Sequence, residues 1–180
     1  MGVSFGRASA LVLIGAILPA SEQDLSGQTV KKSQRGMVMQ MIATTRVSIV
    51  YNRPTARGRK LFGPGGLVPY GKEWNPGADE ATAIDITRDV LIDGQELPAG
   101  RYSIWAIPGE NEWTWIFSRA HDVFHIPYPK GQDALRIKLK PEPGPHMETL
   151  AFYFPVVEPA RAILNFHWGE VVVRIPIAVK

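Results

Sequence analysis

The sequence contains no cysteine. This absence excludes disulfide bonds, thiolate catalysis, zinc–thiolate sites and iron–sulfur clusters. A strong excess of either charge is also missing, because the formal net charge is only +3. So small an excess, without a concentrated basic patch, predicts no binding to nucleic acid. With 45% hydrophobic and 21% charged residues over 180 positions, the composition indicates one ordinary globular domain.

A short apolar stretch lies near the N-terminus. Arg7 precedes the apolar residues 8–18, and Pro19 follows them. A positive charge before about 7–15 apolar residues is typical of a secretory signal peptide. If the segment is retained, it predicts a short apolar helix that anchors the chain in a membrane. Residues 1–20 are therefore expected to be a signal peptide or a retained membrane anchor, and both alternatives stay open.

The rest of the chain divides into a linker and a domain. Residues 21–36 are polar and include Lys31, Lys32 and Arg35, so we interpret them as a linker. From residue 37 to residue 180, apolar and polar side chains alternate with period two, which is typical of half-buried β-strands.

The alternation and the turns between the strands predict an all-β fold. Glycine (17 residues) and proline (15 residues) are plentiful and mark turns, and Asp93-Gly94 is a strong hairpin signal. We therefore expect an antiparallel β-sandwich preceded by a short apolar N-terminal helix. About ten strands are predicted, at residues 37–43, 45–51, 82–87, 89–92, 95–107 with a break, 112–118, 134–140, 147–154, 160–168 and 170–178.

Two segments do not follow the strand pattern. Residues 52–81 are far longer than a usual loop of about 4–6 residues, and residues 121–133 form a smaller irregular stretch. Loops of such length are usually functional or ordered by their own packing. In the first segment, the apolar side chains that we expect to pack on the sandwich are Leu61, Phe62, Leu67, Val68, Tyr70 and Trp74.

Short motifs recur through the domain in a fixed order, at residues 51–54, 58–63, 66–72, 77–82, 97–100, 107–109 and 112–117. With these motifs the chain, over roughly residues 41–180, resembles the bacterial domain-of-unknown-function family twenty-nine eleven. The resemblance implies an exported β-rich protein and implies no particular activity. The chain also resembles the additional β-rich subunit of a bacterial photosynthetic reaction-centre–light-harvesting supercomplex, which implies a structural role beside a membrane complex.

The long irregular segment holds most of the candidate binding residues. Its cations lie beside several glycines, so guanidinium groups and open backbone amides could together bind an anion. The alternative is structural: the same cations would pair with Glu73, Asp79 and Glu80 and fix the loop. The candidate ligand-binding residues are Arg53, Arg57, Arg59, Lys60, Trp74 and Glu80.

No catalytic or metal-binding constellation is predicted. Asp79 and Glu80 are adjacent, so on a strand they would point to opposite faces. His121 and His125 have a spacing that suits a metal on a helix, but the following prolines argue against a helix there. We expect His167 to face outward, and Trp105 to be exposed or part of an interface. No cofactor is predicted either.

Three functions follow as hypotheses. The first is a non-enzymatic structural or docking subunit on the periplasmic face of a membrane protein complex, and the second resemblance points to a photosynthetic complex. The second is a periplasmic protein that binds a small anionic ligand through the long segment. The third is a hydrolase that uses Asp79, Glu80 or the histidines. In the first two cases the protein would be periplasmic, and a retained segment 1–20 would hold it at the cytoplasmic membrane.

Overall fold

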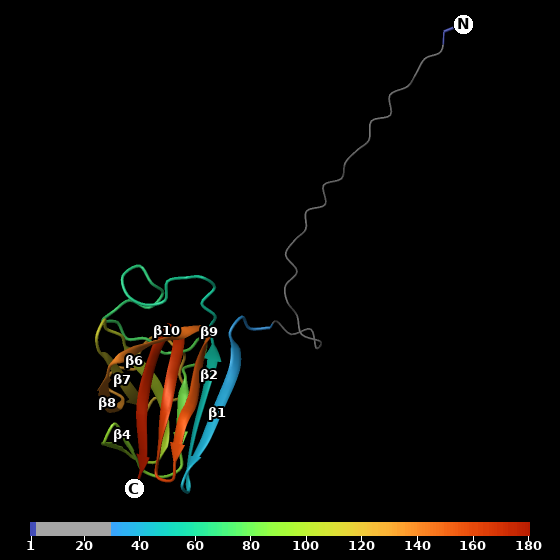
Figure 1. The fold of residues 1–180 in the computed structure, drawn as a ribbon. Helices are drawn as coiled ribbons and strands as arrows, with labels where there is room; N and C mark the ends of the chain where they lie inside the picture. The colour runs from blue at the N-terminus through green and yellow to red at the C-terminus, as the bar shows by residue number, and fades with distance from the viewer. Residues whose placement is uncertain (3–29) are drawn as a thin grey trace. The chain divides into compact units, whose positions relative to one another are not determined.

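The computed structural model describes residues 1–2 and 30–180 (Figure 1). The predicted signal peptide or anchor, and most of the predicted linker, lie outside the described residues. Among the described residues, no helix is long and apolar enough to cross a membrane. The chain divides after Lys31 into two units, and the second, residues 32–180, contains every described strand.

Ten strands form two antiparallel sheets, which confirms the predicted all-β sandwich. The six-stranded sheet has the order β1 (Gln34–Ile42), β2 (Thr45–Arg53), β3 (Ala83–Ile86), β6 (Gly100–Ile107), β7 (Trp113–Ser118) and β8 (Asp133–Leu139). The four-stranded sheet has the order β5 (Gln95–Leu97), β4 (Val90–Ile92), β10 (Arg161–Val179) and β9 (Pro141–Glu158).

Alternation along the strands builds the core between the sheets. In β8, for example, Leu135, Ile137 and Leu139 are buried, whereas Arg136 and Lys138 are exposed. A strand turns successive side chains to opposite faces, so this pattern buries one apolar row and leaves the charged row in water. The same logic places large aromatic side chains in the core, including Trp113, Trp115, Phe117, Phe152 and Phe166.

Some strand boundaries differ from the prediction. The stretch 95–107 is two strands in different sheets, because Pro98 and Ala99 carry the chain from β5 to β6. β1 begins at Gln34, earlier than the predicted start at Met37. β9 is also longer than expected and begins at Pro141.

The last strand reverses direction within its own length. The amide of Val179 donates to the carbonyl of Ala160 at 2.9 Å, yet a straight strand rises about 3.3 Å per residue and would separate these residues widely. Gly169, with φ of 59°, supplies the conformation that a tight reversal requires. The predicted strands 160–168 and 170–178 are therefore the two arms of β10, which lie side by side in Figure 1.

The long segment between β2 and β3 is ordered, as predicted, by its own aromatic side chains. Phe62 packs edge-on against Trp113 with ring centroids 5.0 Å apart, and Trp74 stacks on Trp168 at 6.1 Å. Leu61 and Val68 are buried too, whereas Leu67 and Tyr70 are exposed and do not fix the segment. The loop therefore packs against the core and extends it, whereas most loops lie in solvent.

Candidate functional site

The predicted anion-binding cations donate to main-chain carbonyls. Arg53 Nε donates to the carbonyl of Leu150 at 3.0 Å, Arg59 Nε to that of Ala56 at 2.9 Å, and Lys60 Nζ to that of Pro64 at 2.6 Å. The predicted partners were Glu73, Asp79 and Glu80. These cations therefore fix the loop, but through backbone carbonyls, which a sequence pattern of charges does not indicate.

The remaining candidates lie in separate places. The amide of Arg57, which has φ of 53°, donates to Glu148 Oε1 at 2.7 Å. The hydrogen bond with His146, and then the bond from the Arg57 amide, lower the pKa of the Glu148 carboxyl. Trp74 belongs to the aromatic cluster described above, and Glu80 lines a cleft elsewhere. The structure does not gather the six predicted residues into one site.

The cleft beside Glu80 forms where the two irregular segments meet. The amide of Ala81 donates to the carbonyl of Val123 at 2.9 Å. The amide and the Nδ1 atom of His125 both lie within hydrogen-bond distance of the Asp79 carbonyl, at 2.9 and 2.7 Å. Two segments that are distant in sequence thus build one surface on the outer face of the six-stranded sheet.

We call this depression the charged cleft. Its volume is about 350 Å³, and charged groups of both signs surround a floor of small apolar side chains. Its lining residues are Arg35, Val50, Glu80, Ala81, Ala83, Arg101, His121, Asp122, Val123 and Phe124.

Ion pairs connect the charged groups around the cleft. Arg101 Nη2 lies 3.4 Å from Asp122 Oδ1, and His121 Nδ1 lies 3.0 Å from Asp122 Oδ2. Arg35 Nη1 lies 4.0 Å from Glu80 Oε2. Sequence reasoning missed Arg35, Arg101 and Asp122 as site residues, because they come from β1, β6 and a loop and share no motif.

A buried amide holds Glu80 in place. Asn52 is only 2% exposed, and its Nδ2 donates to Glu80 Oε2 at 2.7 Å and to the Ala78 carbonyl at 2.9 Å. A buried amide with both hydrogens bonded fixes its acceptors strongly. The carboxylate of Glu80 therefore has a defined position at the edge of the cleft.

Two aromatic side chains differ from the prediction. His167 is 2% exposed, with Nε2 2.9 Å from the Pro145 carbonyl and Nδ1 3.2 Å from the Tyr153 hydroxyl. It does not face solvent, because Pro145 and Tyr153 of β9 lie against its ring. Trp105 is also fully buried; it donates to Ser103 Oγ at 2.8 Å and packs under Tyr128. Within residues 30–180 and 1–2, no group of three or more His, Asp or Glu could hold a metal.

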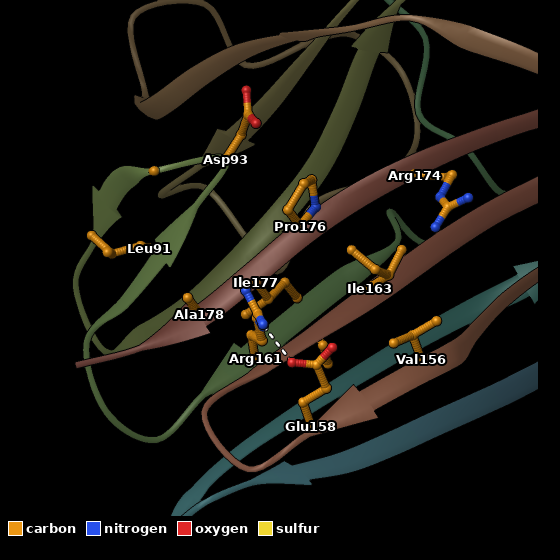
Figure 2. Close-up of a pocket in the computed structure, with 12 residues that line it drawn as sticks. Leu91, Asp93, Val156, Glu158, Arg161, Ile163, Arg174, Pro176, Ile177 and Ala178 are labelled. Atoms are coloured by element: carbon orange, nitrogen blue, oxygen red, sulfur yellow. Dashed lines mark hydrogen bonds and ion pairs between the residues drawn. The ribbon is translucent and has the colours of Figure 1, made fainter.

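An apolar groove of about 470 Å³ lies on the four-stranded sheet (Figure 2). Val156, Ile163 and Pro176 form part of its floor, and an ion pair between Arg161 and Glu158 lies at its border. None of the predicted site residues lines this groove. Charged side chains interrupt its apolar surface.

A second apolar surface lies on strand β1. β1 is the first strand of the six-stranded sheet, so the described strands pair with it along one side only. Its outward side chains include Met37, Met39 and Met41, which are 70, 52 and 45% exposed. We call these three residues and the strand that carries them the methionine edge.

The fold and these surfaces define a β-sandwich with an open strand edge and a charged cleft beside it. The chain belongs to the family described as Protein of unknown function (DUF2911), whose model matches residues 33–177. This match confirms the family that the sequence motifs resemble. No curated protein and no solved structure matches the chain significantly, and nothing in these comparisons supports the photosynthetic resemblance.

Proposed function

We propose that this protein is a non-enzymatic docking subunit that binds a protein partner through the methionine edge. The observation that carries the proposal is the exposure of three alternate methionines on an edge strand of nine residues. An open strand edge presents unpaired backbone groups that another chain can bind by adding a strand. Methionine side chains adapt to irregular partner surfaces, so they suit such an interface.

The register of β1 extends this apolar surface inward. Met37 lies opposite Val50, and Met39 lies opposite Ser48 on β2. At the far end Met41 lies opposite Arg46, whose guanidinium is 3.3 Å from Asp85 Oδ1. A partner strand beside β1 would therefore contact three alternate methionines, with Arg35 before them and Arg46 after them. This arrangement favours specific docking over indiscriminate association.

The location of the partner rests on the sequence. The apolar residues 8–18 predict export or anchoring, and we propose that the sandwich docks on the periplasmic face of a membrane protein complex. With the segment retained, binding to the complex would be confined to the membrane surface, which raises the effective concentration of both partners.

Capture from detergent-solubilised membranes tests the proposal. We expect the full tagged chain to recover a defined membrane complex, and the Met37→Lys/Met39→Lys variant to recover at least tenfold less. Lysine guards natural edges against strand addition. Arg136→Lys/Lys138→Arg on β8, which keeps both positive charges, is the matched control and should leave recovery unchanged. Circular dichroism and melting temperature show whether each variant is folded.

Two results would contradict the proposal. One is equal recovery by the folded methionine variant and the wild type. The other is the loss of recovery in the β8 control, which would place the interface at β8 and not at the methionine edge. A second copy of the chain as the only captured partner would show self-association in place of docking.

A further inference from the structure

We propose that the charged cleft binds a small zwitterion of the amino-acid class, a function separate from docking at the methionine edge. Two cations and two anions line the cleft, paired as Arg35 with Glu80 and Arg101 with Asp122. A ligand with one carboxylate and one ammonium group can pair with an arginine and with an acidic side chain of the cleft at once.

The existing ion pairs are weak enough for a ligand to replace. Arg35 and Glu80 are 4.0 Å apart, Arg101 and Asp122 are 3.4 Å apart, and all four side chains are about half exposed. Exposed ion pairs of this kind contribute little to stability, because water screens them. A bound zwitterion would exchange these contacts for its own and add no net charge to the cleft.

A simple anion fits the same cleft less well. It would recruit Arg35 and Arg101, but it would bring its own negative charge close to the carboxylates of Glu80 and Asp122. Like charges at short distance oppose binding. The balanced set of charges therefore favours a zwitterion over the small anion that the sequence suggests.

The cleft is also shaped for a small ligand. Its floor is made of Val50, Ala81 and Ala83, which leave room above the sheet, and its volume of about 350 Å³ is near the lower end for small-molecule sites. Phe124 at the rim is 52% exposed and could cover an apolar side chain. An aliphatic amino acid matches these features.

The border of the cleft is preorganised. Asn52 holds Glu80, and His125 holds the carbonyl of Asp79, which has φ of 58°. A residue other than glycine rarely adopts this left-handed conformation and keeps it only where its surroundings fix it. A rigid border reduces the entropy that binding has to remove.

Calorimetric titration of the full chain with three matched compounds tests the inference. The probes are L-leucine, 4-methylpentanoate, which lacks the ammonium group, and 3-methylbutylamine, which lacks the carboxylate. We expect the Kd of L-leucine to be at least tenfold lower than that of either half-molecule. Glu80→Gln and Arg101→Gln should each raise it at least tenfold, whereas Glu96→Gln and Arg174→Gln, outside the cleft, should not.

The outcomes are distinct. Tighter binding of 4-methylpentanoate than of L-leucine would overturn the inference in favour of an anion site, and no heat with L-leucine at millimolar concentration would also overturn it. Unchanged affinity in folded Glu80→Gln would place any binding elsewhere. Glu80→Gln keeps an oxygen for the amide of Asn52, so it is expected to fold, and melting temperature verifies this. Recovery of the membrane partner is scored separately, so the two proposals can fail independently.

Discussion

The six-stranded sheet ends in two edges that differ sharply. On β8, the outward side chains Arg136 and Lys138 carry charge and bond to Asp133 and Glu112 at 2.6 and 2.9 Å. On β1, the corresponding outward positions carry exposed methionines. Charged side chains on an edge discourage another strand from pairing with it. The same sheet therefore has one guarded edge and one open edge, and this asymmetry indicates where a partner can bind.

A polar cluster holds the charged side chain of Arg136 in place on β8. Tyr128 donates a short hydrogen bond to Asp133 Oδ1, and Arg136 Nη2 donates to the Tyr128 hydroxyl at 3.0 Å. Burial, and then the bond to Asp133, raises the pKa of Tyr128 to about 12. No methionine on β1 makes comparable polar contacts, so its side chains remain free to adapt to a partner.

The largest effect is expected at the long loop, which packs on the core between the two edges. Trp74→Ala removes a ring that packs with Phe62 and Trp168, and we expect the free energy of unfolding to fall by about 3–5 kcal/mol. Urea denaturation measures this loss. Leu67→Ala, at an exposed position of the same loop, should change it by less than about 0.5 kcal/mol. Equal effects of the two variants would show that the loop does not extend the core.

A smaller effect concerns the guarded edge alone. The pKa of Tyr128 is raised from 10.0 to about 12, so its contribution to stability is complete below pH 10 and is lost as the pH rises towards 12. For a partly exposed group we expect about 1 kcal/mol. Tyr128→Phe should remove this part of the alkaline loss, measured by denaturation at pH 9 and 11.5. Burial also raises the pKa of Tyr102, so some alkaline loss should remain. An unchanged pH profile in Tyr128→Phe would contradict the assignment.

Replacement of a charged side chain on β8 by methionine should make this edge as open to another strand as β1. Lys138→Met deletes the ion pair with Glu112, and because that pair is exposed, stability should change by only a few tenths of a kcal/mol. The expected result is weak self-association at high protein concentration, detected by sedimentation velocity. Lys140→Met lies beyond the end of β8 and serves as the control. If the Lys138 variant sediments like the wild type at all concentrations, charge does not guard this edge.

The smallest effects should distinguish the three methionines. Their exposed fractions fall from Met37 through Met39 to Met41, so single substitutions by alanine should weaken partner capture in that order. Each loss should be within about threefold, because one side chain covers only part of the interface. Quantitative capture against a common tag standard measures the ranking. The reverse order would place the partner nearer to Arg46 than to Met37.

The sequence could predict the features that depend on a local pattern of residues, namely strands, turns and the ordered loop. The alternation of Leu135, Ile137 and Leu139 with charged residues fixes β8, and Asp93-Gly94 forms the predicted hairpin turn with both residues at positive φ. The ordered loop was also predictable, because Phe62 and Trp74 have few alternatives to packing.

The sequence could not predict contacts between residues that are far apart along the chain. Arg35, Arg101 and Asp122 meet only after β1, β6 and the second irregular segment are assembled, and no spacing in the sequence records this. His167 was misplaced for a similar reason, since the cover comes from Pro145 on a neighbouring strand. The methionines had a regular period, but sequence does not reveal that β1 ends the sheet.

Amide hydrogen exchange of the chain, free and bound to its captured partner, tests docking at the methionine edge most directly. We expect exchange to slow across Gln34–Ile42 in the complex and to stay unchanged across Asp133–Leu139, because only the first strand gains backbone hydrogen bonds. Unchanged exchange across Gln34–Ile42 in a complex that demonstrably forms would contradict the account.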